Sequence, residues 1–166
     1  MHATAFEVDS KVGLTTNSLA TVARWSVEWL IKTDGGARSV PAFEFLREQP
    51  PAVRTQLLAI VDAVRTVGPD QWKDRTSHDS MHGSCAHLHE ARDRHGQMLY
   101  RLYLLWQRER RRVVIIDGGA KPNSTALPDS FYDELATLAA SADDDPAPFA
   151  VADDFARAAL TTEEEG

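Results

Sequence analysis

Cysteine is nearly absent from this chain, which has Cys85 as its single cysteine in 166 residues. One cysteine excludes an internal disulfide and is typical of a protein from a reducing compartment. The chain also lacks an apolar run of the roughly 20 residues that a membrane-spanning helix needs. Its first residues have neither the basic start nor the apolar stretch of a signal peptide. We therefore expect a cytoplasmic protein without membrane contact.

Positive charge is scarce overall, with 18 Lys and Arg against 25 Asp and Glu, but it is unevenly placed. Residues 1–142 hold 17 of each sign, so the excess of acid lies entirely in residues 143–166. Residues 82–121 hold eight basic and four acidic residues. This distribution predicts a middle region that binds a polyanion and a solvated acidic C-terminal tail, 143–166. In a sharper alternative, the tail folds back on the basic region and competes with RNA.

The length suits one domain, which we place at residues 23–142. Residues 1–22 show no hydrophobic period and are interpreted as an N-terminal extension. Apolar side chains alternate over residues 24–31, which predicts a half-buried strand. A capping Ser39 and a proline in the first turn predict a short helix over residues 41–48. Apolar residues at helical spacing predict a second helix over residues 52–67.

The second half of the domain predicts three strands followed by a helix. The strands are expected at 86–92, 97–107 and 113–117, with a turn at 93–96, a loop over 118–127 and a helix over 128–142. This order predicts an α+β fold. We expect a small antiparallel or mixed sheet with two N-terminal helices packed on one face and a C-terminal helix.

The predicted hairpin sorts its side chains onto two faces. One face carries mainly apolar side chains and is expected to be the core. The other carries Glu90, Arg92, Arg101 and Tyr103 and is expected to be free for a ligand. With a four-residue turn Arg92 lies opposite Gln97, which puts the two arginines about 13–14 Å apart along the hairpin. Their long side chains could close on one phosphate, because the planar guanidinium binds phosphate with two hydrogen bonds.

Short motifs in this region occur in an order that resembles a known family. They read PAFEFL from residue 41, MHG from 81, LHEAR from 88, YRLY from 100 and VVII from 113, followed by Lys121 and a Pro-initiated helix. This order resembles the RelE/HigB superfamily of toxins, in particular its HigB-like, phage-derived branch. There the corresponding runs read roughly LxG, LWELR, YRIFY and LLHxFxKK.

The resemblance implies a RelE-like fold and a toxin of a type II toxin–antitoxin system. Such a toxin cleaves mRNA on the ribosome without a cofactor and is neutralised by a helix-turn-helix antitoxin. By match, Arg92, Arg101 and Lys121 would bind the scissile phosphate and stabilise its charge. We add Arg94 and Tyr103 as RNA-binding candidates, and Tyr100 as a residue that could stack on a base.

Three positions depart from the family pattern. Gly119 stands where an aromatic residue is usual, Pro122 replaces a second lysine and Asp117 replaces a common histidine. These departures favour a second hypothesis, a RelE-fold protein with weakened catalysis that binds a host or antitoxin-like protein.

A histidine-rich loop precedes the basic strand. His82 is placed to be a general acid or base, because imidazole titrates near neutral pH. The loop residues also include metal-type ligands, which are His78, His82, Cys85, His87 and His89. Their spacing matches no standard closed site, so we expect no metal and expect His87 and His89 to face the core. A metal-dependent enzyme built on this loop is the least favoured alternative.

Overall fold

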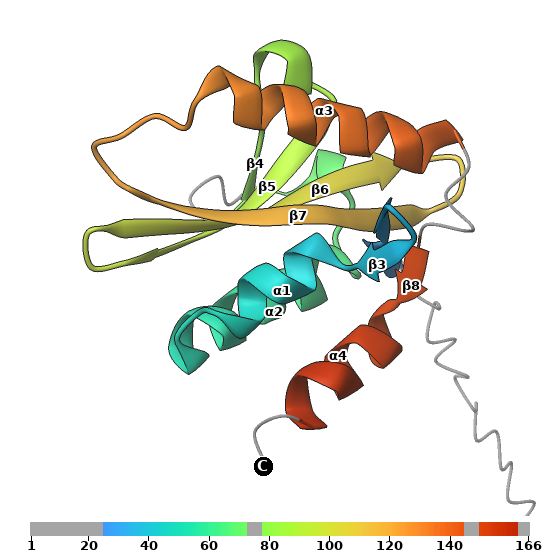
Figure 1. Ribbon diagram of the computed structural model, residues 1–166, viewed down its shortest axis with the longest axis horizontal. Coiled ribbons are helices and arrows are strands. Elements are labelled where there is room, and N and C mark those ends of the chain that lie inside the picture. The colour runs from blue at the N-terminus through green and yellow to red at the C-terminus, as the bar shows by residue number, and fades with distance from the viewer. Residues whose placement is uncertain (1–24, 73–77, 145–149, 163–166) are drawn as a thin grey trace, which may run out of the picture.

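The computed structural model describes residues 25–72, 78–144 and 150–162, which form an α+β fold (Figure 1). The predicted N-terminal extension, residues 1–22, lies outside the described residues. A mixed six-stranded sheet has the order β4-β5-β6-β7-β1-β8. Its strands are β1 (Ser26–Leu30), β4 (His78–Ser80), β5 (Leu88–His95), β6 (Met98–Gln107), β7 (Arg112–Pro122) and β8 (Ala150–Ala152). β1 pairs parallel with β7, and the other neighbouring strands pair antiparallel.

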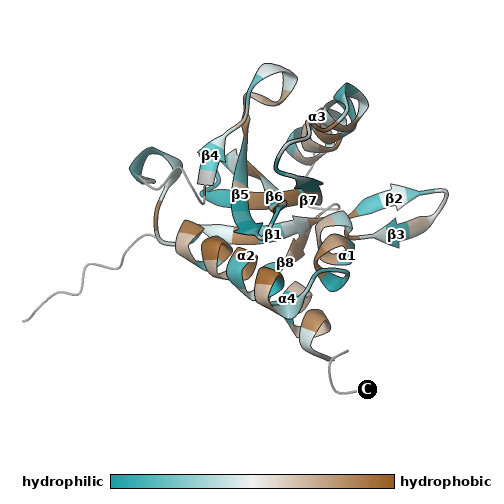
Figure 2. Ribbon diagram, turned by 90° about the vertical axis from the view of Figure 1, so that its left-hand side faces the viewer, coloured by the Kyte–Doolittle hydropathy of each residue, from teal (hydrophilic) through white to brown (hydrophobic). Residues whose placement is uncertain are grey.

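Four helices pack on the two faces of this sheet (Figure 2). They are α1 (Pro41–Arg47), α2 (Pro51–Val64), α3 (Asp129–Asp144) and α4 (Asp153–Thr162). A hairpin of β2 (Lys32–Asp34) and β3 (Ala37–Ser39) precedes α1, and two short 3-10 helices, η1 (Pro69–Gln71) and η2 (Gly83–Cys85), follow α2. None of the helices in the described ranges is long and apolar enough to cross a membrane.

Each face of the sheet has its own hydrophobic core. α1, α2 and α4 cover one face, and α2 buries the apolar stripe that its sequence spacing predicts. α3 covers part of the other face, where Leu135 and Ala139 pack with Leu105 and Val114. The prediction of an uncovered ligand face was therefore wrong in part. Beside the start of α3, Arg92 and Arg101 still line an open cleft on that face, and Arg94 nearer the β5–β6 turn is exposed.

The β5–β6 hairpin has a tighter turn than predicted. His95 pairs with Met98, which leaves a two-residue turn, and Arg92 pairs directly with Arg101. Gly96 takes a φ of 61°, a conformation that glycine adopts without steric cost at the first position of such turns. The predicted pairing placed Gln97 opposite Arg92, four residues from the true partner, Arg101. Because this shift is an even number of residues, each side chain still lies on the predicted face of the hairpin. The two arginines are cross-strand neighbours, with Cβ atoms expected about 5 Å apart rather than 13–14 Å.

β7 continues through a stretch that was predicted to be a loop. Its glycines let the sheet come close to both layers of helices. A Cβ on Gly118 would overlap the ring of Phe45 in α1, and one on Gly119 would lie 3.6 Å from the ring of Phe131 in α3 and 3.3 Å from the Tyr103 hydroxyl. The small residues that made this stretch resemble a loop are needed here for close packing.

The C-terminal segment is part of the sheet instead of a solvated tail. β8 pairs with β1, and α4 buries Ala156 and Leu160. Asp153 is 3% exposed and accepts a 2.8 Å hydrogen bond from Trp29 Nε1. It also pairs with Arg65 and Arg157. The described part of this segment lies at the sheet edge opposite β4 and β5, so it does not cover Arg92 or Arg101. Residues 163–165 lie outside the described residues.

Candidate functional site

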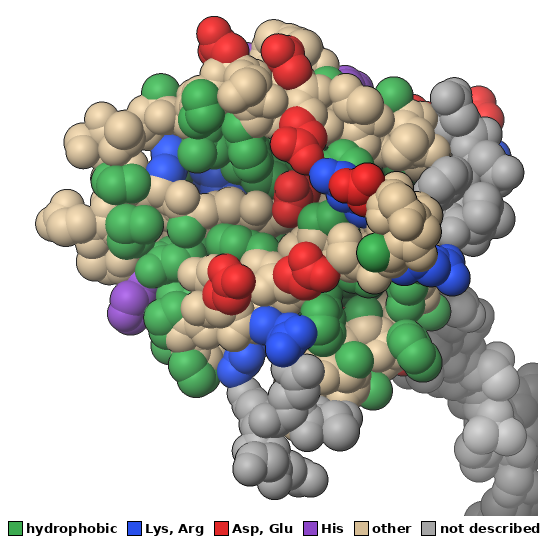
Figure 3. Space-filling view, in the orientation of Figure 1, with side chains coloured by type: hydrophobic (Ala, Val, Ile, Leu, Met, Phe, Trp, Pro, Cys, Tyr) green, Lys and Arg blue, Asp and Glu red, His purple; other side chains and the backbone are tan. Residues whose placement is uncertain are grey.

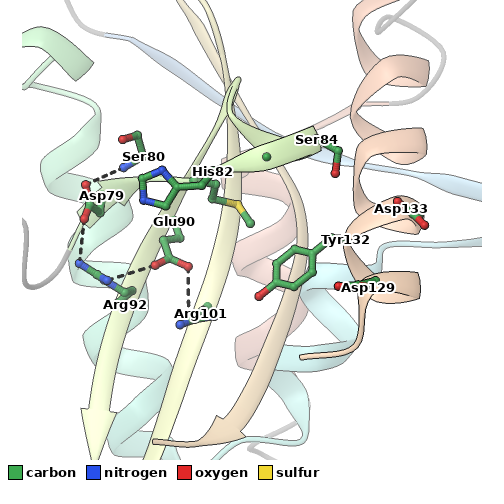
Figure 4. A pocket seen from close by; sticks show the side chains of 12 residues that line it. Asp79, Ser80, His82, Ser84, Glu90, Arg92, Arg101, Asp129, Tyr132 and Asp133 are labelled. Atoms are coloured by element: carbon green, nitrogen blue, oxygen red, sulfur yellow. Dashed lines mark hydrogen bonds and ion pairs between the residues drawn. The ribbon is translucent and has the colours of Figure 1, made fainter. Parts of the chain in front are cut away.

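A cleft of about 640 Å³ opens where the β5–β6 hairpin, the loop before β5 and the start of α3 meet (Figure 4). This volume is in the usual range for ligand sites. The cleft is lined by Asp79, Ser80, Met81, His82, Gly83, Ser84, Glu90, Arg92, Arg101, Asp129, Tyr132 and Asp133. Figure 3 shows Lys and Arg side chains set back beneath the start of α3.

Glu90 joins the two arginines of the hairpin. Its Oε1 lies 3.2 Å from Arg92 Nη1, and its Oε2 lies 3.1 Å from Arg101 Nε. The Glu90 side chain is 11% exposed and that of Arg101 is 12% exposed. A carboxylate this far removed from water needs such partners, and it in turn fixes where both guanidinium groups point.

Acidic side chains outnumber basic ones around the cleft. Asp79 Oδ2 lies 3.5 Å from Arg92 Nη2, and Asp129 and Asp133 line the α3 wall. With Glu90, four carboxylates face two guanidinium groups. The sequence predicted cations that converge on a phosphate, and the cleft that contains two of them carries both signs of charge.

Only part of the predicted constellation comes together here. His82 lines the cleft with Arg92 and Arg101, on an exposed loop close to Asp79 and Glu90 (Figure 4). Lys121 faces the same side of the sheet, next to Leu99, but its Nζ donates to the backbone oxygen of Thr125 and it does not line the cleft.

Arg94 also lies outside the cleft. It is exposed, on the same face as Arg92 and one side-chain pair closer to the turn. Arg94 and Lys121 therefore extend the basic surface away from the cleft and do not converge with the arginine pair.

Neither of the two tyrosines that the sequence proposed for RNA binding, Tyr100 and Tyr103, lines the cleft. Tyr103 is fully buried, with its ring centroid 5.4 Å from that of Phe131, and Tyr100 is 9% exposed in the core on the opposite face. Neither ring can stack on a base, so that expectation was wrong. Burial raises the pKa of Tyr103, although Arg101 acts in the other direction, so its hydroxyl remains a hydrogen-bond donor. Tyr132 of α3 is the aromatic side chain that lines the cleft.

The histidine-rich loop does not gather its ligands. His87 is exposed in the turn before β5, which corrects the expectation that it faces the core. His89 does face the core, edge to face with Trp106, and burial lowers the pKa of its imidazole. The side chain of His78 lies outside the described ones. Among the side chains that the structure describes, no three metal-type ligands come together.

Several cleft residues escaped prediction. Asp79, Asp129, Tyr132 and Asp133 come from an edge strand and from α3, which sequence alone does not place beside the hairpin. Glu90 could have been found, because the alternation along β5 puts it on the same face as Arg92, two residues away. Its position between the arginines was hidden by the incorrect turn length.

Asp117 lies on β7 across from Tyr103 and carries an unusual carboxyl. Burial raises its pKa to about 6, the charge of Glu134 acts in the same direction, and the Gly118 amide and Lys32 oppose the shift. A folded-state pKa above the ordinary value means that the folded protein binds a proton more tightly between about pH 4 and 6. Stability is therefore lost as pH rises through this window.

Asp117→Asn should stabilise the protein by about 1–2 kcal/mol at pH 8, because the variant does not have to bury an ionised carboxylate. The advantage should disappear below about pH 3, where the wild-type carboxyl is neutral in both states. Thermal unfolding at the two pH values measures this, with a shift of a few degrees expected at pH 8. An equal shift in melting temperature for Asp117→Asn at both pH values would contradict the raised pKa of Asp117. The control is Asp154→Asn, which changes an exposed carboxylate.

Comparison of the chain with protein-family models, curated proteins and solved structures gave no match. The fold class stands on the structure itself. The likeness to RelE/HigB toxins stays a prediction from ordered motifs, and the proposal below is carried by the chemistry of the cleft.

Proposed function

We propose that this protein is a RelE/HigB-type toxin, an endoribonuclease that cleaves mRNA on the ribosome and is neutralised by a helix-turn-helix antitoxin. One observation carries the proposal. Two arginines on neighbouring strands, Arg92 and Arg101, face an open cleft with a buried carboxylate, Glu90, between them. This arrangement supplies two guanidinium groups that can bind a phosphate and, between them, a carboxylate that can accept a proton.

The reaction that fits these groups is internal attack by a ribose 2′-hydroxyl on the adjacent phosphorus. Glu90 accepts the hydroxyl proton as the new P–O2′ bond forms, and the P–O5′ bond then breaks. His82, at the rim, donates a proton to the leaving O5′. The products are a 2′,3′-cyclic phosphate and a free 5′-hydroxyl, so no metal or co-reactant is required.

Glu90 links proton transfer to charge stabilisation. While ionised, it occupies both arginines and competes with the phosphate for them. Once protonated, it holds them less strongly, at the moment when negative charge grows on the phosphorane. Cations that become available as this charge develops stabilise the transition state more than the ground state. Arg94 and Lys121, outside the cleft, would contact the phosphates of flanking nucleotides.

One observation favours a second function. Four carboxylates against two guanidinium groups would also suit a cationic segment of a protein. In that case the chain would be a RelE-fold protein that acts by binding a host or antitoxin-like protein without cleaving RNA.

Expression in bacteria separates the two functions. The wild-type chain should arrest growth and cause mRNA cleavage in a translation extract, and Arg92→Ala/Arg101→Ala should lower cleavage by at least about 10³-fold, since each arginine stabilises the phosphorane. Arg110→Ala, an exposed arginine in the β6–β7 turn, is the matched control and should cleave normally. Growth arrest without cleavage would instead support the protein-binding function.

A further inference from the structure

We propose that the α3 wall of the cleft recognises a guanine base next to the reacting phosphate, through stacking on Tyr132 and hydrogen bonds to Asp129 and Asp133. The proposal rests on the RNA-cleaving function above and specifies its substrate. It concerns residues that lie across the cleft from the arginine pair.

The three α3 residues form one surface. Positions 129, 132 and 133 are three and four residues apart, a spacing that places side chains on the same side of a helix. All three line the cleft, and the Tyr132 ring points from α3 toward Arg101 (Figure 4). The ring is half-buried and lies edge to face with Phe131, 5.7 Å between centroids. The Cys85 thiol donates a 3.3 Å hydrogen bond to the Tyr132 backbone oxygen, which links α3 to η2 in the loop before β5.

Tyr103 lies on β6 next to the arginine end of the cleft, across from Glu90. Tyr103 is 0% exposed and does not line the cleft, and its hydroxyl lies within hydrogen-bonding reach of the Arg101 side chain. It lies close enough to Arg101, Glu90 and Tyr132 for each of them to influence its pKa. Tyr103 therefore packs against Arg101 from within the core, and its hydroxyl is not accessible to a ligand in the cleft.

The two ends of the cleft therefore suit different ligand groups, one a hydrogen-bond acceptor and the other a hydrogen-bond donor. Arg92 and Arg101 offer donors to a phosphate. Asp129 and Asp133 offer only acceptors, with an aromatic ring between the two ends. A nucleotide has this polarity, with the anion at one end and a flat base at the other, and single-stranded RNA is commonly read by stacking and by hydrogen bonds to base edges.

Among the four bases, guanine best matches a carboxylate. Its N1–H and 2-amino group are adjacent donors that can meet both oxygens of one carboxylate. Adenine and cytosine have an amino group beside a ring nitrogen acceptor, which would face a carboxylate oxygen. Uracil has one N–H between two carbonyls. Guanine is therefore the base that can form two charge-assisted hydrogen bonds to one of these carboxylates, which are exposed on the α3 wall.

Binding of non-cleavable RNA tests this proposal. The probes are 2′-O-methyl oligouridylates of eight nucleotides with one central guanine, inosine, adenine or cytosine, together with the all-uridine form, measured by fluorescence anisotropy. We expect the wild-type protein to bind the guanine probe about tenfold or more tightly than any other. Inosine is the sharpest comparison, because it lacks only the 2-amino group.

The acidic wall is tested by Asp129→Asn/Asp133→Asn, which should reduce the guanine preference to less than twofold. The exposed Asp154→Asn on α4 is the matched control and should keep the preference. Equal affinity for all probes, or a preference that the double variant retains, would overturn the guanine proposal even if RNA is cleaved.

Two further outcomes are informative. Failure of the wild-type protein to bind or cleave any RNA would overturn both this inference and the proposed function. Tight binding of an arginine-rich peptide, lost in Asp129→Asn/Asp133→Asn while RNA binding is unchanged, would assign the wall to a protein partner and overturn the guanine proposal.

Discussion

Replacing Glu90 with glutamine should slow RNA cleavage by about 10²–10⁴-fold while RNA binding becomes roughly tenfold tighter. The amide keeps the shape of the side chain but cannot accept the 2′-hydroxyl proton. It also removes the negative charge that lies 3.1–3.2 Å from the two arginines, which are then more available to a phosphate. Single-turnover cleavage and anisotropy with a non-cleavable RNA measure the two effects separately.

The matched control for Glu90→Gln is Glu109→Gln, an exposed glutamate in the β6–β7 turn, which should alter neither quantity. Weaker binding and slower cleavage together in Glu90→Gln would show that Glu90 only holds the arginines in place. Cleavage at the wild-type rate would remove Glu90 from the mechanism.

Asp153→Ala should lower the free energy of unfolding by about 3–5 kcal/mol, the usual cost of removing one partner from a buried ion pair. Asp153 is 3% exposed and lies against three donors, which are the Trp29 indole and the Arg65 and Arg157 guanidinium groups. Its loss leaves these groups without their shared acceptor, and it loosens α4 from the sheet. Urea unfolding followed by Trp fluorescence measures the change.

Asp154→Ala is the control for Asp153→Ala, since it removes the neighbouring exposed carboxylate from the same first turn of α4. We expect it to change stability by less than about 0.5 kcal/mol. A loss of less than 1 kcal/mol in Asp153→Ala would mean that the C-terminal segment contributes little to the fold.

Local patterns were sufficient for much of the architecture. The apolar stripe of α2 and the alternation along β5 and β6 predicted their burial, because both depend on periods within one element. The α+β fold class and the two N-terminal helices on one face are confirmed. The same alternation placed Arg92, Arg101 and Glu90 on one side of the hairpin.

Features that depend on partners distant in the chain were not predicted. The acidic composition of residues 143–166 indicated a solvated tail, whereas Trp29 and Arg65 provide the donors that allow Asp153 to be buried. The acidic wall was missed for the same reason, because it exists only once α3 packs beside the hairpin. Glycines in β7 suggested a loop, but they allow close contact with Phe45 and Tyr103.

We propose different roles for the arginine pair with Glu90 and for the carboxylates of α3. The arginine pair with Glu90 suits chemistry on a phosphate, and the α3 carboxylates suit selection of a base. Variants in one set should therefore change the rate of cleavage, and variants in the other should change which sequence is cleaved.

The most direct test uses purified protein, translating ribosomes and an mRNA that contains one 2′-deoxynucleotide at the cleaved position. The mechanism predicts that unmodified mRNA is cut to a 2′,3′-cyclic phosphate and a 5′-hydroxyl, that the deoxy substitution abolishes cleavage there, and that Arg92→Ala/Arg101→Ala abolishes it everywhere. Cleavage that tolerates the deoxy substitution, or intact mRNA in the presence of folded wild-type protein, would contradict it.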